Sequence, residues 1–255
     1  MNGLAEVTAA ILAGGLGTRL RSAIGDRPKV LASIHNRPYL TYLLDHLASA
    51  AVREVVLLTG YQADQVSRAL GATYRGMRLV YSPEPAPLGT GGALRWALPW
   101  LTAPVVLLMN GDSYCDVDFT AFWDFHHRKA ADLSLVLAEV VDASRYGKAR
   151  MARGGQVVRF GEKEHGGAGG WINAGIYLLK RALIEDIPAG RTVSLERDLF
   201  PAWASRGRRV YGYRCGGRFI DIGTPESLAE AEAFFRPYLV ERMGHPSYSG
   251  SSRKS

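Results

Sequence analysis

A glycine-rich segment near the N-terminus is followed by two cationic side chains, a combination suited to binding phosphate. The segment Gly14-Gly15-Leu16-Gly17-Thr18 directly follows an apolar run, Arg19 comes next, and Lys29 lies a little further along the chain. Glycines let backbone N–H groups approach phosphate oxygens, because no Cβ atom stands in the way. Arg19 and Lys29 add the mobile positive charge that a triphosphate requires. We therefore expect an anion site here, with Arg19 and Lys29 as catalytic cations.

Two widespread phosphate-binding motifs do not describe this segment. A P-loop would continue with lysine and then serine or threonine after its last glycine, whereas Thr18 and Arg19 follow here. The dinucleotide fingerprint of dehydrogenases needs a third glycine, and Leu20 occupies that position. The missing glycine and the absence of a suitable hydride-transfer constellation argue against a dinucleotide-dependent dehydrogenase.

Two aspartates lie where a bound cation would compensate their charge. Asp112 follows the apolar run 104–110, so it falls at the carboxyl end of an expected strand, where open α/β sheets bind ligands. Asp221 is flanked by apolar residues, and a carboxylate buried without a partner is costly. Carboxylates, phosphate oxygens and water are the ligands that Mg²⁺ prefers. We expect Asp112 and Asp221 to hold Mg²⁺; the alternative for each is to cap a neighbouring helix.

Glu84 precedes a second glycine-rich segment, residues 88–92, which leads into an expected helix. A carboxylate can accept hydrogen bonds from N1–H and the exocyclic amine of guanine at the same time. Uracil offers one such donor, so a uridine nucleotide is the alternative. Glu84 thus favours guanine without settling the base.

The alternation of apolar and amphipathic segments predicts an α/β fold. Strand-length apolar runs occur at residues 7–13, 54–59, 78–81 and 104–110. Amphipathic segments separate them, and helices are expected from Pro38 onward and at residues 62–70 and 93–100. This order predicts a doubly wound, parallel sheet with helices on both faces.

The pattern changes after residue 132, where helical segments become rarer. We expect a strand at residues 133–140, a hairpin at 148–160 that turns at Arg153-Gly154-Gly155, a strand at 171–179 and a helix at 194–205. The expected organisation is one domain, residues 1–237. Its nucleotide-binding half covers 7–131, a small sugar-side subdomain covers 132–237, and a flexible tail covers 238–255.

The overall composition excludes several protein classes. Basic residues outnumber acidic ones by 31 to 24, a formal charge of +7, but no aromatic interleaving or helix-turn-helix pattern supports nucleic-acid binding. The N-terminus lacks a basic leader and its apolar run is broken by Gly14 and Gly15, so we expect neither a signal peptide nor a membrane span, and a cytoplasmic location. Cys115 and Cys215 belong to no metal-binding or disulfide pattern and are expected to be packed thiols.

The string Leu12-Ala13-Gly14-Gly15-Leu16-Gly17-Thr18-Arg19-Leu20, with Pro28-Lys29 after it, resembles the signature of the sugar-1-phosphate nucleotidyltransferases. The resemblance covers residues 7–235. It implies the nucleotide-diphospho-sugar transferase type of fold, a Rossmann-like mixed, mostly parallel sheet, and Mg²⁺ held by Asp112 and Asp221. Together with Glu84, the nucleotide-binding residues would be Leu12, Ala13, Gly14, Gly15, Gly17, Thr18, Gly89 and Thr90.

Three later segments resemble the sugar-side motifs of that family: Tyr146-Gly147, Glu162-Lys163 and Asn173-Ala174-Gly175. The residues implied to bind the sugar phosphate are Gly111, Gly147, Glu162, Lys163 and Asn173. Within this set the lysine would hold the phosphate. Glu196 resembles an acidic position of related enzymes, and an ordinary surface ion pair is its alternative.

The finer match is to the D-glycero-α-D-manno-heptose 1-phosphate guanylyltransferases, through residues 15–22, 38–44 and 194–199. In the implied reaction the sugar-phosphate oxygen attacks the α-phosphorus in line and pyrophosphate leaves. A phosphate monoester has a second pKa near ~6, so it is already largely dianionic and needs no general base. His46 is accordingly expected to be a packed or surface-exposed residue and not a catalytic one. His126 and His127 are expected to lie on an exposed helix.

We therefore expect a guanylyltransferase that uses GTP and a sugar 1-phosphate for surface polysaccharide synthesis, and that can form a homo-oligomer. One alternative is a uridylyltransferase for another sugar 1-phosphate. Another is a non-catalytic sensor of sugar nucleotides, against which the joint presence of cations and carboxylates argues, because binding alone needs no complete set.

Overall fold

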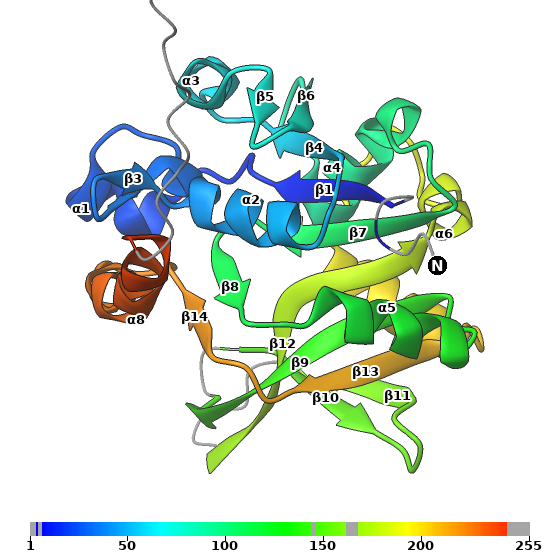
Figure 1. Ribbon diagram of the computed structural model, residues 1–255. Helices are drawn as coiled ribbons and strands as arrows, with labels where there is room; N and C mark the ends of the chain where they lie inside the picture. The colour runs from blue at the N-terminus through cyan, green and yellow to red at the C-terminus, as the bar shows by residue number, and fades with distance from the viewer. Residues whose placement is uncertain (1–3, 5–6, 144–145, 162–167, 244–255) are drawn as a thin grey trace, which may run out of the picture.

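The computed structural model describes residue 4 and residues 7–143, 146–161 and 168–243, and its elements are shown in Figure 1. Four strands form the parallel centre of a ten-stranded sheet: β1 (Thr8–Leu12), β4 (Glu54–Thr59), β6 (Met77–Pro83) and β7 (Val105–Asn110), in the order β7-β1-β4-β6. Parallel strands covered on both faces have nearly continuous apolar sequences. For this reason the four apolar runs predicted these strands correctly.

The rest of the large sheet is mixed, as the resemblance implies. β12 (Ala168–Lys180) runs antiparallel beside β7, β9 (Leu133–Asp142) runs antiparallel beside β12, and β13 (Val210–Cys215) lies parallel to β9. The expected hairpin is present as β10 (Lys148–Met151) and β11 (Val157–Gly161). Its turn contains Gly154 and Gly155 with φ of 97° and 89°, a region that glycine adopts without strain. β5 (Thr73–Tyr74) closes the far edge on β6.

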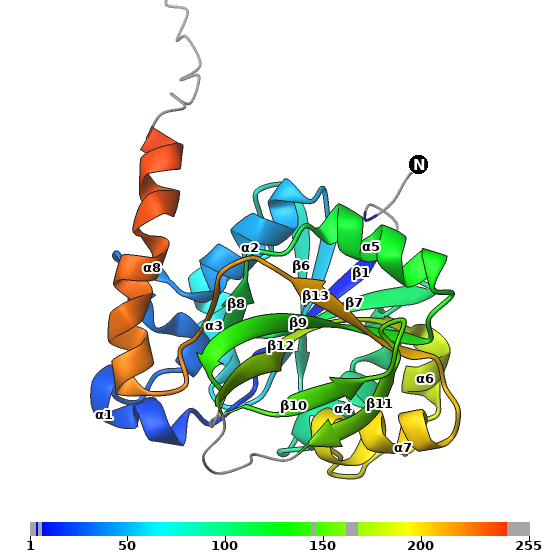
Figure 2. The ribbon, with the colours of Figure 1, turned by 90° about the horizontal axis from the view of Figure 1, so that it is seen from below.

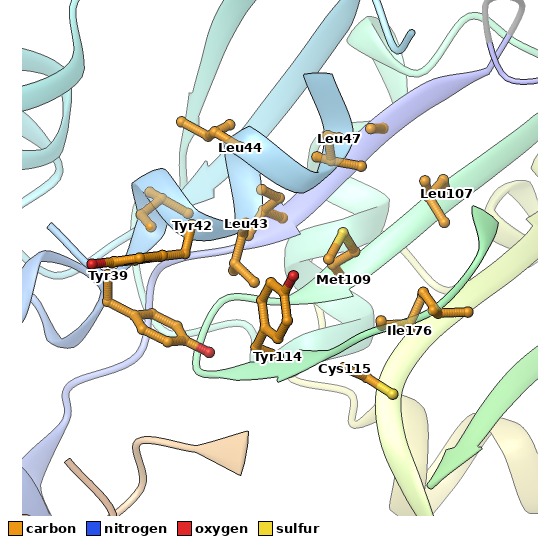
Figure 3. Packing of buried hydrophobic residues seen from close by; sticks show 14 of the residues in the cluster. Tyr39, Tyr42, Leu43, Leu44, Leu47, Leu107, Met109, Tyr114, Cys115 and Ile176 are labelled. Atoms are coloured by element: carbon orange, nitrogen blue, oxygen red, sulfur yellow. The ribbon is translucent and has the colours of Figure 1, made fainter. Parts of the chain in front are cut away.

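Helices cover both faces of the sheet, as Figure 2 shows from below. One face carries α2 (Leu40–Ser49), α3 (Ala63–Leu70), α5 (Phe119–Arg128) and α8 (Pro225–Met243), and the other carries α4 (Gly89–Trp96), α6 (Arg181–Glu185) and α7 (Phe200–Ser205). Ala9 and Ala10 of β1 are both fully buried, yet they belong to different hydrophobic clusters, because successive strand residues point to opposite faces. Figure 3 shows the cluster beneath α2.

Short elements complete the fold. Single helical turns occur at η2 (Thr18–Leu20), η3 (Lys29–Leu31), η4 (Leu98–Trp100) and η5 (Leu195–Leu199), and α1 is Arg21–Ile24. Two small ladders pair β2 (Ser33–Ile34) with β3 (Arg37–Pro38) and β8 (Ser113–Cys115) with β14 (Phe219–Asp221). No described helix is long and apolar enough to cross a bilayer.

Three expected helices have different bounds in the structure. The helix expected from Pro38 begins at Leu40, because Arg37–Pro38 pairs as β3. The helix expected at residues 93–100 begins at Gly89, so the second glycine segment lies inside α4. The expected Ser194 cap is confirmed, since its Oγ accepts a hydrogen bond from the Arg197 amide, but the helix after it is divided into η5 and α7.

Two expectations about exposure were wrong. His126 is only 3% exposed, because it continues the buried stripe of Phe119 and Phe122 along α5, and burial lowers its pKa to about 4. Residues 238–243, which were expected to belong to the flexible tail, instead continue α8, and the Tyr238 hydroxyl donates to Asp116. Cys115 and Cys215 are free, buried thiols, as expected, with their sulfur atoms 3.7 Å apart.

Candidate functional site

Two cavities meet at the carboxyl ends of the parallel strands. The larger, of about 640 Å³, lies between the glycine loop after β1 and the segment after β6, and the smaller, of about 160 Å³, lies toward β12 and β14. Asn110 and Asp112 line both cavities. The end of β7 is therefore the point at which ligands in the two cavities would meet.

Most residues expected to bind nucleotide line the larger cavity, namely Leu12, Gly14, Gly15, Glu84, Gly89 and Thr90, and Lys29, expected to be a catalytic cation, lines it too. Gly111, which the resemblance assigned to the sugar phosphate, lines this cavity as well. Gly17 is not among the residues that line the cavity. Its φ of 57° turns the chain, and a Cβ atom there would come within 3.0 Å of the Lys29 side chain. Ala13 and Thr18 also lie outside the lining residues.

The Glu84 carboxylate is part of the wall of the larger cavity. Its Oε2 atom accepts a hydrogen bond of 3.0 Å from the Leu88 amide, and burial raises the pKa of the carboxyl above its usual value. Its Oε1 atom lies close above Gly60, where an added Cβ would approach to 2.6 Å. The glycines at positions 14 and 60 thus leave room for the Glu84 carboxylate at the cavity wall.

The second glycine segment serves packing more than ligand contact. A Cβ atom would come within 2.6 Å of the Val193 carbonyl oxygen at Gly89, and within 2.5 Å of the Arg191 carbonyl oxygen at Gly92. The Gly91 amide donates to the Val193 carbonyl over 2.8 Å. Because three of the first four residues of α4 are glycines, the helix can approach the chain before η5, and this contact brings Gly89 and Thr90 to the cavity wall.

Lys29 and Asp112 form an ion pair of 2.7 Å, with the lysine side chain 11% exposed and the aspartate 45% exposed. The lysine lies in η3 and lines the larger cavity. Arg19 is exposed and lines the smaller cavity, beside Asp112. The two expected cations are therefore divided between the two cavities.

The small β8–β14 ladder places Asp221 next to the segment that carries Asp112. Asp221 pairs in register with Ser113, and the Ile222 amide donates to the Asp112 carbonyl over 2.9 Å. The Asp221 carboxylate accepts hydrogen bonds from the Gly223 amide and from the Tyr146 hydroxyl. Thr224, not Asp221, caps α8, because its Oγ1 accepts from the Ser227 amide. Asp221 lines the smaller cavity.

The residues around these two carboxylates fit a hard divalent cation. In the part of the chain that the structure describes, no cluster of three or more histidine, cysteine or acidic side chains surrounds a common point. Asp112 and Asp221 both line the smaller cavity and offer oxygen ligands only. Such a pair leaves coordination positions for phosphate oxygens and water, which is how Mg²⁺ is usually bound.

On the sugar side, Asn173 lines the smaller cavity and is held at both ends of its amide. Its Oδ1 accepts from the Gly175 amide over 3.1 Å, and its Nδ2 donates to the Tyr177 hydroxyl over 2.8 Å. Gly147 lies next to it, since its carbonyl accepts from the Asn173 amide. Glu162 and Lys163 lie outside the described residues.

The Glu196 carboxylate lies between residues of the nucleotide side and residues of the sugar side. In the described part of the chain it does not form the surface ion pair that was its alternative role. Its carboxylate accepts from Thr90 over 3.0 Å, and the Tyr177 hydroxyl, which holds Asn173, lies 3.5 Å from its other oxygen. Sequence reasoning missed Tyr177. Its place four residues after Asn173 on the expected strand was the available signal.

Asn110 was also missed, although it directly precedes the Gly111-Asp112 pair. It packs against Gly175, where φ is +76° and an added Cβ would lie 2.7 Å from the Asn110 Nδ2 atom. Its Oδ1 atom is buried and has no hydrogen-bond partner among the described residues. Asn110 therefore presents an unpaired acceptor where the two cavities join.

Comparisons with known proteins agree with this arrangement. The profile of a family described as nucleotidyl transferase matches residues 8–236. D-glycero-α-D-manno-heptose 1-phosphate guanylyltransferase from Aneurinibacillus thermoaerophilus is 35% identical, and the match covers 91% of this chain and 99% of that protein. Mannose-1-phosphate guanylyltransferase from Mycobacterium tuberculosis is also 35% identical, but the match covers 89% of this chain and only 64% of that protein.

Solved structures give the same picture. HddC from Yersinia pseudotuberculosis, complexed with GMP-PN, is similar with a TM-score of 0.81 and 33% identity, covering 90% of this chain and 100% of that one. A putative glucose-1-phosphate thymidylyltransferase from Bacillus anthracis has a TM-score of 0.80 at 21% identity, over 90% of this chain and 95% of that one, a likeness of fold alone.

Proposed function

Since the chain belongs to the nucleotidyl transferase family, we propose that it transfers the guanylyl group of GTP to a sugar 1-phosphate. The proposed acceptor is D-glycero-α-D-manno-heptose 1-phosphate, and the products are a GDP-sugar for surface polysaccharide synthesis and pyrophosphate. The observation that carries the proposal is the junction of two cavities at Asp112, one lined by a glycine loop and Lys29, the other by Arg19 and Asn173.

The larger cavity would bind the nucleotide. Backbone amides around Gly14 and Gly15 would face the phosphates, and Lys29 would supply charge to them. The Glu84 carboxylate, at the other end, would accept from the two adjacent donors of guanine. The remaining proposed nucleotide-binding residues are Leu12, Ala13, Gly17, Thr18, Gly89 and Thr90.

The smaller cavity would bind the sugar phosphate. Asn173 and Gly147 would contact the sugar, and Glu162 and Lys163 would complete the site, with the lysine on the phosphate. Gly111 would lie between the two substrates. We accordingly assign nucleotide binding to residues 7–131 and sugar-phosphate binding to residues 132–237 of a single domain.

Nucleotidyl transferases generally use a divalent metal ion, and we propose Mg²⁺ for this chain. Asp112 and Asp221 would hold it, because their oxygens are the hard ligands that Mg²⁺ prefers. When bound, it would neutralise charge on the nucleotide phosphates.

In the proposed reaction, an oxygen of the sugar phosphate forms a bond to the α-phosphorus of GTP. The bond between the α-phosphorus and the bridging oxygen breaks, and pyrophosphate leaves with the electron pair. Arg19 and Lys29 stabilise the charge that develops on the phosphate oxygens. No general base is needed, because a phosphate monoester is largely dianionic above its second pKa of ~6.

Pyrophosphate release tests this function directly. The protein would be incubated with Mg²⁺, one sugar 1-phosphate and each nucleoside triphosphate in turn, with an Asp112→Ala variant as the control for contaminating enzymes. We expect release with GTP and the heptose phosphate. Preference for UTP would make the protein a uridylyltransferase, and no release with any pair would favour a non-catalytic sensor.

Mannose 1-phosphate is the second candidate acceptor, because one relative at 35% identity is a mannose-1-phosphate guanylyltransferase. The ratio of kcat/KM values for the two sugars would decide between them. We further propose that the enzyme acts in the cytoplasm, where nucleoside triphosphates are available, without a nucleic-acid partner. Light scattering would measure whether it forms a homo-oligomer.

A further inference from the structure

Tyr39 carries a buried hydroxyl group that no described residue satisfies. The side chain is 0% exposed, and its oxygen has no hydrogen-bond partner among the described residues. The other buried tyrosines nearby are paired: Tyr42 donates to the Ile34 carbonyl over 3.1 Å, and Tyr114 donates to Tyr238 over 2.8 Å. An unpaired buried hydroxyl costs free energy, so its retention calls for a compensating role.

The surroundings of Tyr39 connect it to both carboxylates of the proposed cation site. Its pKa lies well above the usual value, first because of burial and then because of the negative charges of Asp112 and Asp221. Tyr39 thus lies in the electrostatic surroundings of both carboxylates, although its hydroxyl is hydrogen-bonded to neither of them. A tyrosine hydroxyl in these surroundings can donate to water bound between it and the carboxylates.

The packing of Tyr39 fixes it relative to both carboxylates. Its amide donates to the Ala32 carbonyl over 2.8 Å, just after the turn that holds Lys29. Its ring meets Phe235 of α8 edge-to-face, with centroids 6.0 Å apart. Because Lys29 pairs with Asp112 and α8 follows Asp221 closely, Tyr39 is held between the elements that carry the two aspartates.

We propose that Tyr39 is a positioning residue for the divalent cation, donating a hydrogen bond to the oxygen cluster that Asp112, Asp221 and cation-bound water would form. The inference rests on the proposed function, because it assumes that these aspartates hold the cation. Hydrogen bonds behind metal ligands orient the ligands, and their loss lowers metal affinity about 10- to 100-fold.

A matched pair of variants tests this role in the full chain. Tyr39→Phe removes only the unpaired hydroxyl, whereas Tyr42→Phe, at the start of the same helix, removes a hydroxyl bonded to a backbone carbonyl. Titration calorimetry with Mn²⁺ alone gives the metal Kd, and thermal unfolding gives Tm. We expect Tyr39→Phe to raise the Kd for Mn²⁺ about tenfold or more without lowering Tm. We expect Tyr42→Phe to lower Tm and leave the Kd unchanged.

The outcomes separate this inference from the proposed function. An unchanged Kd in Tyr39→Phe, in a protein whose Mn²⁺ binding is abolished by Asp112→Ala, would overturn the role of Tyr39 and leave the cation site intact. If the wild-type protein releases pyrophosphate but the Asp112→Ala variant binds Mn²⁺ as tightly as the wild type, both the cation site and the inference would be overturned. If Tyr39→Phe does not fold, Tyr39→Met removes the same hydroxyl and is expected to weaken Mn²⁺ binding equally.

Discussion

The Nζ atom of Lys29 lies 2.7 Å from the Oδ2 atom of Asp112, where the two cavities join. The pair is asymmetric, because the lysine is 11% exposed and the aspartate 45% exposed. A half-exposed carboxylate keeps much of its hydration, whereas a buried ammonium without a partner is costly. The stability of an Asp112 variant should therefore depend on whether the new side chain still offers Lys29 a hydrogen-bond acceptor.

Asp112→Asn should remove activity with little change in stability. The amide oxygen still accepts from Lys29, but the charge that would bind a cation is gone. We expect pyrophosphate release to fall at least about 10²-fold to 10³-fold, the range seen when one electrostatic partner of a transition state is lost. Asp112→Ala should be equally inactive and melt at a lower temperature. Asp186→Asn, at an exposed ion pair with Arg208, is the control that should retain full activity.

Glu84→Gln should reduce the preference for GTP over UTP. Glutamine keeps one acceptor oxygen but replaces the other with a donor, so it cannot accept from both guanine donors. We expect the ratio of kcat/KM values for GTP and UTP to fall about 10- to 100-fold, equivalent to one charge-assisted hydrogen bond of about 1.5–3 kcal/mol. An unchanged ratio would mean that Glu84 does not contact the base.

The same carboxyl predicts a pH dependence of GTP binding. Burial raises the pKa of Glu84 above the usual 4.5, so it takes up a proton at a higher pH than an exposed glutamate. Guanine needs the ionised form, and KM for GTP should therefore rise as the pH falls toward that raised pKa. In Glu84→Gln this rise should be absent, because the amide does not titrate.

Replacing Gly15 with alanine should affect substrate binding, whereas replacing Gly92 with alanine should affect stability. A Cβ atom at Gly15 meets nothing within 4 Å, whereas at Gly92 it would lie 2.5 Å from the Arg191 carbonyl oxygen. Gly15→Ala should raise KM for GTP without changing Tm, because the methyl group stands where phosphate would approach. Gly92→Ala should lower stability by about 1–3 kcal/mol through overpacking. Equal losses of stability in both variants would contradict the assignment of the loop to phosphate.

His126 should make the fold sensitive to mild acid. Burial lowers its pKa from 6.5 to about 4, so between these values the unfolded chain binds a proton that the folded chain does not. Stability from this group is complete above pH 6.5 and is lost as the pH falls toward 4, by at most about 3 kcal/mol. The unfolding free energy, measured with urea across this pH range, should change less steeply with pH in His126→Gln than in the wild type. An identical slope would mean that His126 is not the source of the acid sensitivity.

The sequence predicted those parts of the protein that depend on local pattern. The parallel strands and the glycine loop were predicted because burial on both faces and glycine content are visible within a few residues. The family resemblance, drawn from residues 12–20 and 28–29, is confirmed by the match of the nucleotidyl transferase profile to residues 8–236. The position of Asp112 at a strand end followed from the same local pattern.

What the sequence did not predict depends on contacts between distant segments. The start of α4 was placed too late, because Gly91 and Gly92 appear as helix breakers until Arg191 and Val193 are seen against them. His126 appeared polar and exposed, yet its hydrogen bond to Ser134 on β9 makes it a core residue. No local signal distinguishes the unpaired hydroxyl of Tyr39 from the paired one of Tyr42 on the same helix.

The β8–β14 ladder has a consequence for biosynthesis of the protein. Its strands lie in opposite halves of the chain, and it places Asp221 in register with Ser113. A nascent chain that ends before β14 contains Asp112 but not Asp221, so the two carboxylates that line the smaller cavity come together only after residue 221 has been synthesised. A product truncated before β14 would therefore lack one of the two aspartates proposed to hold the cation and is expected to release no pyrophosphate.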